Sequence, residues 1–351
     1  MTPLSNGHGA AAARPALISE AQSLSSVPKA AAQCCYLLSS DGEDSYPETT
    51  FIAIALLRRV YKDACVTLIV DEITERKVPH RVRPALDSAN QVIRVKADFP
   101  GSSARSRYIK TSMRSLVDAP FVFLDSDALV IAKIDEAFFC ETPIAAALDL
   151  NSTFPYPHSP EWIQPIYDHF GWAYPVKHYF NTGVVYWADT PETWRLSELW
   201  HERWQTVVGK FGTYQDQPSF NSAVADLGIQ VKVLPTECNA MVEAHPRFAK
   251  GARIFHFFAS KPSSVSRSKT LLGHLLNAYQ LTKQIDWQAV ESATANSDAW
   301  VGLTEDIGIE WARRHYRRVA TTIWKRGWRI AWRRAKRLNT LLRDGKSPLK
   351  H

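Results

Sequence analysis

The sequence has few of the features that mark secreted and membrane-spanning proteins. Its 351 residues include five cysteines, and no two of them form a C-x-x-C pair. An odd, unpaired set favours buried thiols in a reducing compartment over a disulfide framework. No segment reaches the roughly 18 uncharged apolar residues that a spanning helix needs, and the first residues lack the basic and apolar regions of a secretory signal. We therefore expect a cytoplasmic protein.

The body of the chain has no excess of positive charge. From Glu305 onward there are 14 Lys and Arg against four Asp and Glu, which leaves 28 against 31 for the first 304 residues. A nucleic-acid groove needs a basic stripe on the folded domain. The distribution therefore argues against nucleic acid as a partner and assigns the basic surplus to the C-terminal tail.

What the chain does have is the composition of a globular core, with 45% hydrophobic and 11% aromatic residues. Residues 1–31 are rich in Ala, Ser and Pro without an apolar period, which predicts a disordered leader. We expect a globular domain over residues 32–285 and a basic, helical tail over residues 286–351.

Strand and helix patterns alternate through that domain, which predicts an α/β fold with a mostly parallel sheet covered on both faces. The predicted strands are 34–38, 66–70, 92–95, 121–124, 143–150, 178–187, 231–234 and 253–258. The predicted helices are 50–61, 103–117, 194–208 and 217–225.

The most informative segment is 121–130. A four-residue apolar run ends in Asp125 and Asp127, and apolar residues resume at Ala128. Carboxylates at the C-terminal end of a buried strand face the ligand crevice of an α/β sheet, and their oxygens suit Mg²⁺ or Mn²⁺. A surface turn is the alternative, because Asp and Ser are common turn formers. The apolar residues on both sides favour a metal site, and such an ion suits a diphosphate.

Two further motifs carry polar groups near predicted element ends. Asp216 and Gln217 precede a helix, where capping would explain Asp216 but not Gln217. His256 lies in an apolar strand pattern, which alone is more typical of a core histidine. As a third ligand beside two carboxylates it would favour Mn²⁺ over Mg²⁺.

The helix before the Asp pair carries cations on one face, at Arg107, Lys110 and Arg114. A solvated helix face accounts for most of them. Because this helix leads directly into the Asp strand, it could present one cation to a diphosphate.

Taken in order, these motifs resemble glycosyltransferase family 8, the retaining GT-A enzymes that include glycogenin-like proteins and lipopolysaccharide galactosyltransferases. The matching elements are the Arg/Lys helix, Phe-Leu-Asp-Ser-Asp at 123–127, Tyr-Phe-Asn-Thr-Gly-Val-Val-Tyr at 179–186, Tyr-Gln-Asp-Gln at 214–217, and His256 followed by Lys261-Pro262. In the family's closing motif a Gly stands three residues after the His and the Lys six after it. Here Ala259 stands third and Lys261 fifth, so this loop is one residue shorter.

The resemblance implies the GT-A fold and metal-dependent transfer of a sugar, expected to come from a UDP-hexose, to a carbohydrate or lipid-linked acceptor with retention. It implies that Asp125, Asp127 and His256 hold Mn²⁺ (or Mg²⁺) and that Asp216 and Gln217 are catalytic. The implied nucleotide- and donor-binding residues are Leu38, Ser39, Lys110, Ser126, Asn181, Gly183 and Lys261.

An amide is a poor nucleophile, so the Gln at 217 favours a front-face route over a covalent intermediate. Two other functions stay open. One is a phosphohydrolase of the haloacid dehalogenase kind, although such enzymes place Asp-x-Asp on the first strand. The other is a non-catalytic protein that binds sugar nucleotides or a membrane surface.

Residues 310–342 predict a long amphipathic helix in the tail. Trp324, Trp328 and Trp332 border its apolar face, and Lys and Arg occupy most of the opposite side. This pattern is typical of a helix that lies on anionic lipid. Packing on the body, a partner helix and a polyanion contact are the alternatives. We expect peripheral association with the inner membrane face.

Overall fold

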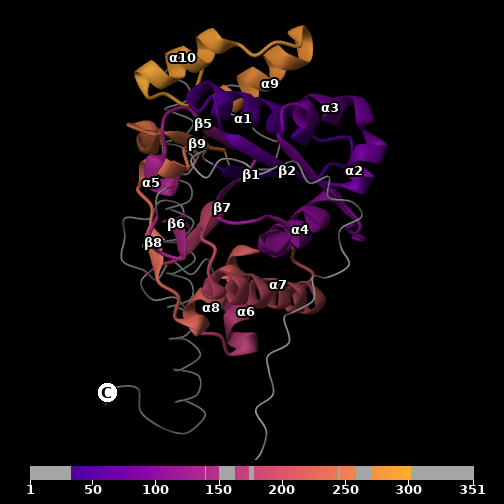
Figure 1. Cartoon of the computed structure of the whole chain (residues 1–351), viewed down its shortest axis with the longest axis vertical. Coiled ribbons are helices and arrows are strands. Elements are labelled where there is room, and N and C mark those ends of the chain that lie inside the picture. Colours follow the sequence, from indigo (N-terminus) through magenta and orange to yellow (C-terminus); the bar gives the residue numbers. More distant parts are fainter. Residues whose placement is uncertain are drawn as a thin grey trace, which may run out of the picture. The chain divides into compact units, whose positions relative to one another are not determined.

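The computed structural model describes residues 33–138, 140–149, 163–173, 178–243, 246–257 and 270–301. These residues belong to one compact unit that ends at Val301 (Figure 1). The predicted leader and the predicted tail helix lie outside the described residues.

Each predicted strand and helix has a counterpart in the structure, and β5 and six of the described helices were not predicted. The strands are β1 Gln33–Leu38, β2 Cys65–Asp71, β3 Gln91–Val95, β4 Phe121–Leu124, β5 Ala128–Val130, β6 Ile144–Leu148, β7 Phe180–Trp187, β8 Val231–Val233 and β9 Ile254–His256. The helices are α1 Tyr46–Val60, α2 Glu72–Lys77, α3 Pro79–Asp87, α4 Ser102–Leu116, α5 Asp135–Phe138, α6 Gln164–Phe170, α7 Pro191–Phe211, α8 Gln217–Leu227, α9 Leu271–Thr282 and α10 Trp287–Asn296.

A seven-stranded sheet in the order β3-β2-β1-β4-β7-β6-β8 forms the centre of the unit. Strand β7 runs antiparallel to its neighbours β4 and β6, and the other pairs are parallel. Strands β5 and β9 form a separate antiparallel pair. The α/β class and the mostly parallel mixed sheet are therefore confirmed.

Helices cover both faces of this sheet because its strands are apolar on both sides. In β1, Cys34, Tyr36 and Leu38 face one core, which α1, α9 and α10 complete. Cys35 and Leu37 face the other core, with side chains from α4, α7 and α8. Figure 1 shows these two helical layers on opposite sides of the sheet. The period of two in a strand thus distributes its residues between two cores.

Helix α10 belongs to the compact unit, although the predicted tail begins at residue 286. Val290 and Ala293 of α10 are buried in the same core as α1. Arg59 of α1 pairs with Glu291 of α10.

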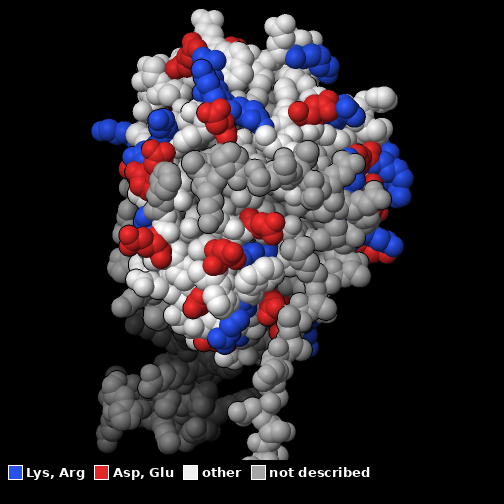
Figure 2. Space-filling view, in the orientation of Figure 1, with Lys and Arg blue, Asp and Glu red and all other residues white. Residues whose placement is uncertain are grey.

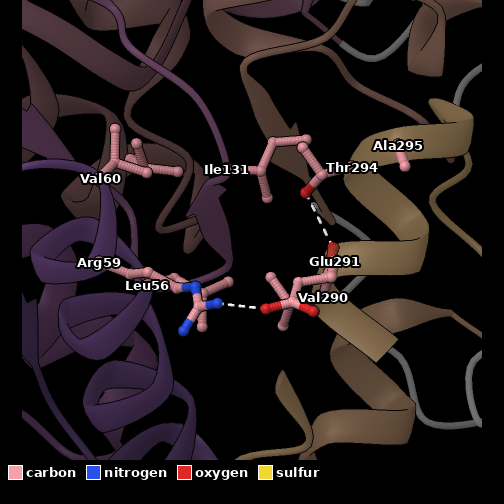
Figure 3. Close-up of a pocket in the computed structure, with 9 residues that line it drawn as sticks. Leu56, Arg59, Val60, Ile131, Val290, Glu291, Thr294 and Ala295 are labelled. Carbon is pink, nitrogen blue, oxygen red and sulfur yellow. Dashed lines mark hydrogen bonds and ion pairs between the residues drawn. The ribbon is translucent and has the colours of Figure 1, made fainter. Parts of the chain in front are cut away.

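A cavity of about 390 Å³ lies between α1, α10 and β5, lined mainly by apolar side chains (Figure 3). No predicted site residue lines it. The cavity is therefore separate from the predicted site residues.

Candidate metal and donor-sugar site

The end of β4 places Asp125 beside β7. The two strands pair antiparallel, with Leu124 opposite Val184. The Asp125 N–H then donates to the Gly183 carbonyl over 2.7 Å. The apolar run of β4 is fully buried, so the chain delivers its first polar side chain at the sheet edge.

The small β5–β9 ladder places Asp127 beside His256. Ala128 is the register partner of His256, and the Phe257 N–H donates to the Asp127 carbonyl over 3.0 Å. The apolar residues after the Asp pair form β5 and are fully buried. Residues 125–127 thus form a half-buried turn between two buried strands, and not a fully exposed surface turn.

Asp125, Asp127 and His256 converge, and one ligand atom from each lies within 4.8 Å of the others. Burial by itself lowers the pKa of His256, but the hydrogen bond and charge of Asp127 outweigh it, and the net shift is upward. Burial raises the pKa of Asp127, yet His256 and Lys110 bring it below its usual value. The imidazole and the two carboxylates therefore form one electrostatic group.

Gly183 leaves the room that this group needs. A Cβ at this position would lie 2.4 Å from His256 Cε1 and 2.9 Å from Asp125 Oδ2. Two hard carboxylate oxygens and one imidazole also suit Mn²⁺ in their chemistry. The donor set and the glycine cradle therefore fit a divalent cation.

Helix α4 brings two cations to the same site. Lys110 Nζ lies 2.9 Å and 3.0 Å from the two carboxylate oxygens of Asp125. It also lies 3.7 Å from Asp216, and Arg107 lies 3.1 Å from that carboxylate. Lys110 is only 1% exposed, so its charge is held inside the site. Arg114 turns away, because it pairs with Asp189 and lies over the ring of Trp194.

Asp216 precedes α8, but its side chain makes no capping hydrogen bond. It accepts instead from the Thr182 hydroxyl over 2.8 Å. Burial raises the pKa of Asp216. The charges of Lys110 and Arg107 and the Thr182 hydrogen bond lower it by more, so the pKa lies below its usual value. The capping interpretation is wrong, and Asp216 is an ionised carboxylate held by cations.

A buried network of amides joins the carboxylates to the rest of the site. Asn181 Nδ2 donates to Gln217 Oε1 over 2.9 Å and to Asp149 Oδ1 over 3.2 Å. Asn181 Oδ1 accepts from the Gly183 N–H over 2.8 Å. Asn239 Nδ2 also donates to Asn181 Oδ1, over 3.0 Å. Asn181, Gly183 and Gln217 therefore lie together, as the resemblance implies.

The other predicted donor-binding residues lie in three places. Leu38 is part of the apolar core at the end of β1. Ser39 follows it and is buried, and its hydroxyl has no hydrogen-bond partner among the described residues. Ser126 is half-buried in the turn between the two aspartates. Lys261 lies outside the described residues.

Sequence reasoning missed several residues of the site. Arg107 is on the predicted cationic face, but only Lys110 was assigned. Thr182, Asp149 and Asn239 had no signal of their own, because their partners lie in other elements, 17 to 58 residues away along the chain. Thr182 lies inside the Asn-Thr-Gly motif, whose matched position was the only available hint.

Over the face shown in Figure 2, acidic and basic side chains of the described residues are interspersed. No basic stripe is visible among them, in keeping with the charge balance of the first 304 residues. Among the described residues, no helix is long and apolar enough to cross a membrane.

Residues 113–261 match the sequence profile of the nucleotide-diphospho-sugar transferase family. The matched range contains the Asp pair, the Asn-Thr-Gly motif, Asp216, Gln217 and His256. It confirms the resemblance to family 8 glycosyltransferases and supports a glycosyltransferase. No curated protein matches the chain.

Solved structures similar to this chain include glycosyltransferases. The galactosyltransferase LgtC, in complex with donor and acceptor sugar analogs, is 15% identical, with a TM-score of 0.47 over 78% of this chain and 98% of that chain. An active-site mutant of LgtC is 15% identical, with a TM-score of 0.48 over 74% and 99%. The glycosyltransferase GlyE of Streptococcus pneumoniae is 15% identical, with a TM-score of 0.45 over 78% and 66%.

Proposed function

We propose that this protein is a metal-dependent glycosyltransferase that moves a hexose from a UDP-linked donor to a carbohydrate or lipid-linked acceptor, with retention of configuration. The observation that carries the proposal is the convergence of Asp125, Asp127 and His256 at one edge of the sheet. The family match over the same residues supports it.

Asp125, Asp127 and His256 would hold Mn²⁺ (or Mg²⁺) in this proposal. A bound divalent cation supplies positive charge to a departing diphosphate. Lys110 lies against Asp125 and places an ammonium group beside the same carboxylate. Lys261 is proposed to contact the diphosphate as well, on the strength of its matched position.

The donor sugar is proposed to lie against Asp216 and Gln217. Asp216 is an acceptor-only group at neutral pH, and Thr182 and Arg107 orient it. An oriented carboxylate binds sugar hydroxyls in one arrangement, which positions the anomeric carbon. Asn181 and Gly183 lie at the same site, bonded to Gln217 and Asp125.

The base and ribose are proposed to lie over the end of β1, at Leu38 and Ser39, and near Ser126. The buried Ser39 hydroxyl has no hydrogen-bond partner among the described residues, so it is available to a ligand there. Because the side chain of Leu38 is in the core, its contribution would come from the backbone.

Retention is proposed to follow a front-face route. Gln217 is an amide whose Oε1 already accepts from Asn181, and an amide is a poor nucleophile. A covalent glycosyl intermediate ordinarily needs a carboxylate, and Asp216 is held by two cations and a hydroxyl.

The test is a donor-hydrolysis screen over UDP- and GDP-sugars, with and without Mn²⁺. We expect hydrolysis of one UDP-hexose that requires Mn²⁺ and is lost in Asp127→Ala. The matched control is Asp87→Ala, which removes an exposed carboxylate on α3 that pairs only with Arg83. Equal activity of Asp127→Ala and the wild type would overturn the metal assignment.

The same screen separates the remaining alternatives. A non-catalytic binding protein would bind UDP with Mn²⁺ but release no sugar. A phosphohydrolase would release inorganic phosphate, but its Asp pair belongs on the first strand, whereas Asp125 follows β4, the fourth strand of the chain.

The tail is proposed to hold the enzyme on the inner face of the membrane. Its charge from Glu305 onward and its Trp border support this proposal. An anionic surface would then bring a lipid-linked acceptor close to the site.

A further inference from the structure

Asn239 lies between the proposed metal site and the proposed sugar site. It ends the 3₁₀ helix Thr236–Asn239 and is fully buried. Its Oδ1 is 2.7 Å from His256 Nδ1, and its Nδ2 is 3.0 Å from Asn181 Oδ1. A single amide therefore contacts a proposed metal ligand on one side and the sugar-site network on the other.

Side-chain amides can be built with oxygen and nitrogen exchanged, so the donors and acceptors in this series of hydrogen bonds must be assigned from a group of known role. The backbone N–H of Gly183 can only donate, and it lies 2.8 Å from one side-chain atom of Asn181, which must then be its oxygen. The opposite atom of Asn181 faces the Asp149 carboxylate, which accepts, so it must be the NH₂ group. Both contacts therefore assign the same orientation to the Asn181 amide.

That orientation determines the state of His256. Because Asn181 presents its oxygen, Asn239 must face it with its NH₂ group. The carbonyl oxygen of Asn239 then faces His256 Nδ1, so Nδ1 must carry a hydrogen. In the imidazolium both nitrogens carry a hydrogen, and Nε2 faces Asp127 Oδ1 at 3.4 Å. In the neutral imidazole with a hydrogen on Nδ1, Nε2 instead directs a lone pair to that side of the ring.

We propose that Asn239 is a positioning residue that holds the neutral His256 in the Nδ1–H tautomer, so that the lone pair of the imidazole lies on Nε2, the nitrogen on the side of the two aspartates. The inference rests on the proposed function for the identity of the ion. Ligating histidines are generally oriented by an acceptor on their second nitrogen, and loss of that acceptor weakens metal binding about 10- to 100-fold.

The backbone holds Asn239 in this place independently of its side chain. The Ala240 N–H donates to the Ile254 carbonyl over 3.0 Å, and the His256 N–H donates to the Ala240 carbonyl over 2.9 Å. These bonds join the 3₁₀ helix to β9. A change of the Asn239 side chain therefore removes the contact to the imidazole while the backbone contact remains.

The first measurement needs neither metal nor activity. Protein labelled with ¹⁵N-histidine is studied without metal, at alkaline pH, by long-range ¹H–¹⁵N correlation. The His256 signals are assigned by their loss in His256→Gln. We expect a proton on Nδ1 and none on Nε2. The opposite tautomer in the wild-type protein would overturn the proposal.

The second measurement compares two substitutions. In Asn239→Ala we expect His256 to shift towards the Nε2–H tautomer, which predominates in unconstrained histidine. We expect Mn²⁺ affinity, measured by calorimetry, to fall about 10- to 100-fold. Asn239→Asp keeps an acceptor facing Nδ1–H, so it should retain the wild-type tautomer and bind Mn²⁺ more tightly than Asn239→Ala. Equal behaviour of the two variants would contradict a role through this acceptor.

Asn90→Ala is the control for general destabilisation. Asn90 accepts from the Val66 N–H and from Arg58, on the far side of β2 from the site residues. The Asn90→Ala substitution should lower the melting temperature and leave the His256 tautomer unchanged. If the wild-type protein binds no Mn²⁺, the proposed function fails, whereas the tautomer still decides the role of Asn239.

Discussion

At the scale of the residue, the site depends on side chains whose atoms must stay within hydrogen-bond distance of one another. Gly183 provides room between β7 and the converging ligands, and its carbonyl anchors Asp125. Lys110 and Arg107 keep Asp216 ionised through their charges. The geometry of the site therefore depends on Gly183 as well as on its charged side chains.

Gly183→Ala should weaken Mn²⁺ binding while leaving the fold in place. The added Cβ would lie 2.4 Å from His256 Cε1, so the imidazole must move away from the carboxylates. We expect a loss of about tenfold or more in affinity by calorimetry, comparable to the loss of a group that orients a ligand.

Gly209→Ala is the matched control for that substitution. No atom lies within 4 Å of a Cβ at this position in α7. Alanine there should stabilise the protein by up to about 1 kcal/mol and leave Mn²⁺ affinity unchanged. Wild-type Mn²⁺ affinity in Gly183→Ala would contradict the need for a residue without a Cβ at this position.

At the scale of the element, two contacts position the site. The β5–β9 ladder of three residue pairs places Asp127 beside His256. The packing of α4 on α7 positions Arg107 and Lys110, and in that contact Thr111 of α4 bonds to His201 of α7 over 2.7 Å. Neither contact includes a proposed ligand at its centre, so each can be changed separately.

Leu129→Ala should affect stability and metal binding together. Leu129 is fully buried in the middle of β5 and pairs with Phe255. Truncation of a buried Leu costs about 2–5 kcal/mol, and a looser ladder should also lower Mn²⁺ affinity. Urea unfolding and calorimetry measure the two effects. Leu281→Ala, at a position 85% exposed on α9, should change neither.

His201 should make the protein less stable in mild acid. Burial lowers the pKa of His201 from 6.5 to about 4. Between these values the unfolded chain binds a proton that the folded chain does not, so the free energy of unfolding falls as pH drops from 6.5 to about 4. The expected loss is at most about 3 kcal/mol, from about 1.4 kcal/mol per pKa unit between 6.5 and about 4.

Urea unfolding at pH values across that window measures this loss. His201→Gln removes the titrating group and should reduce the pH dependence. His80→Gln replaces an exposed histidine and should leave the pH dependence as in the wild type. An unchanged slope in His201→Gln would show that another group is responsible.

At the scale of the whole molecule, the proposed division is between a catalytic body and a basic tail. The described body ends at Val301. Every proposed metal or sugar ligand precedes this point, whereas the basic surplus follows it. Binding to a surface and turnover of a soluble donor should therefore be separable.

Removal of residues 302–351 should abolish co-sedimentation with anionic vesicles and preserve donor hydrolysis. Each basic residue near such a surface contributes about 1 kcal/mol, and the attraction should weaken as salt shortens the Debye length. Neutral vesicles are the control for the lipid charge.

Full-length protein with Arg329, Arg333 and Lys336 changed to Gln tests the same point without truncation. It should sediment less than the wild type. Sedimentation of the truncated chain with anionic vesicles would assign binding to the body and contradict the tail proposal.

The sequence by itself determined the order of the main strands and, approximately, their ends. Apolar runs with sharp polar ends are local signals, so the strand predicted at 121–124 coincides with β4, and the strand predicted at 66–70 lies within β2. The same local pattern led to Asp125 and Asp127. Helices α2, α3, α5, α6, α9 and α10 were not predicted. Helices α2, α5 and α6 have only four to seven residues, which is too short for a helical period to stand out.

Only the tertiary structure decided which distant groups meet. Ala128 pairs with His256, and Asn239 contacts Asn181, although these partners are far apart along the chain. It also decided that Arg107 faces Asp216 while Arg114 turns to Asp189. The physical reason is that periodicity reports which face of an element is buried. The choice of partner across that face depends on how the sheet and its covering helices pack.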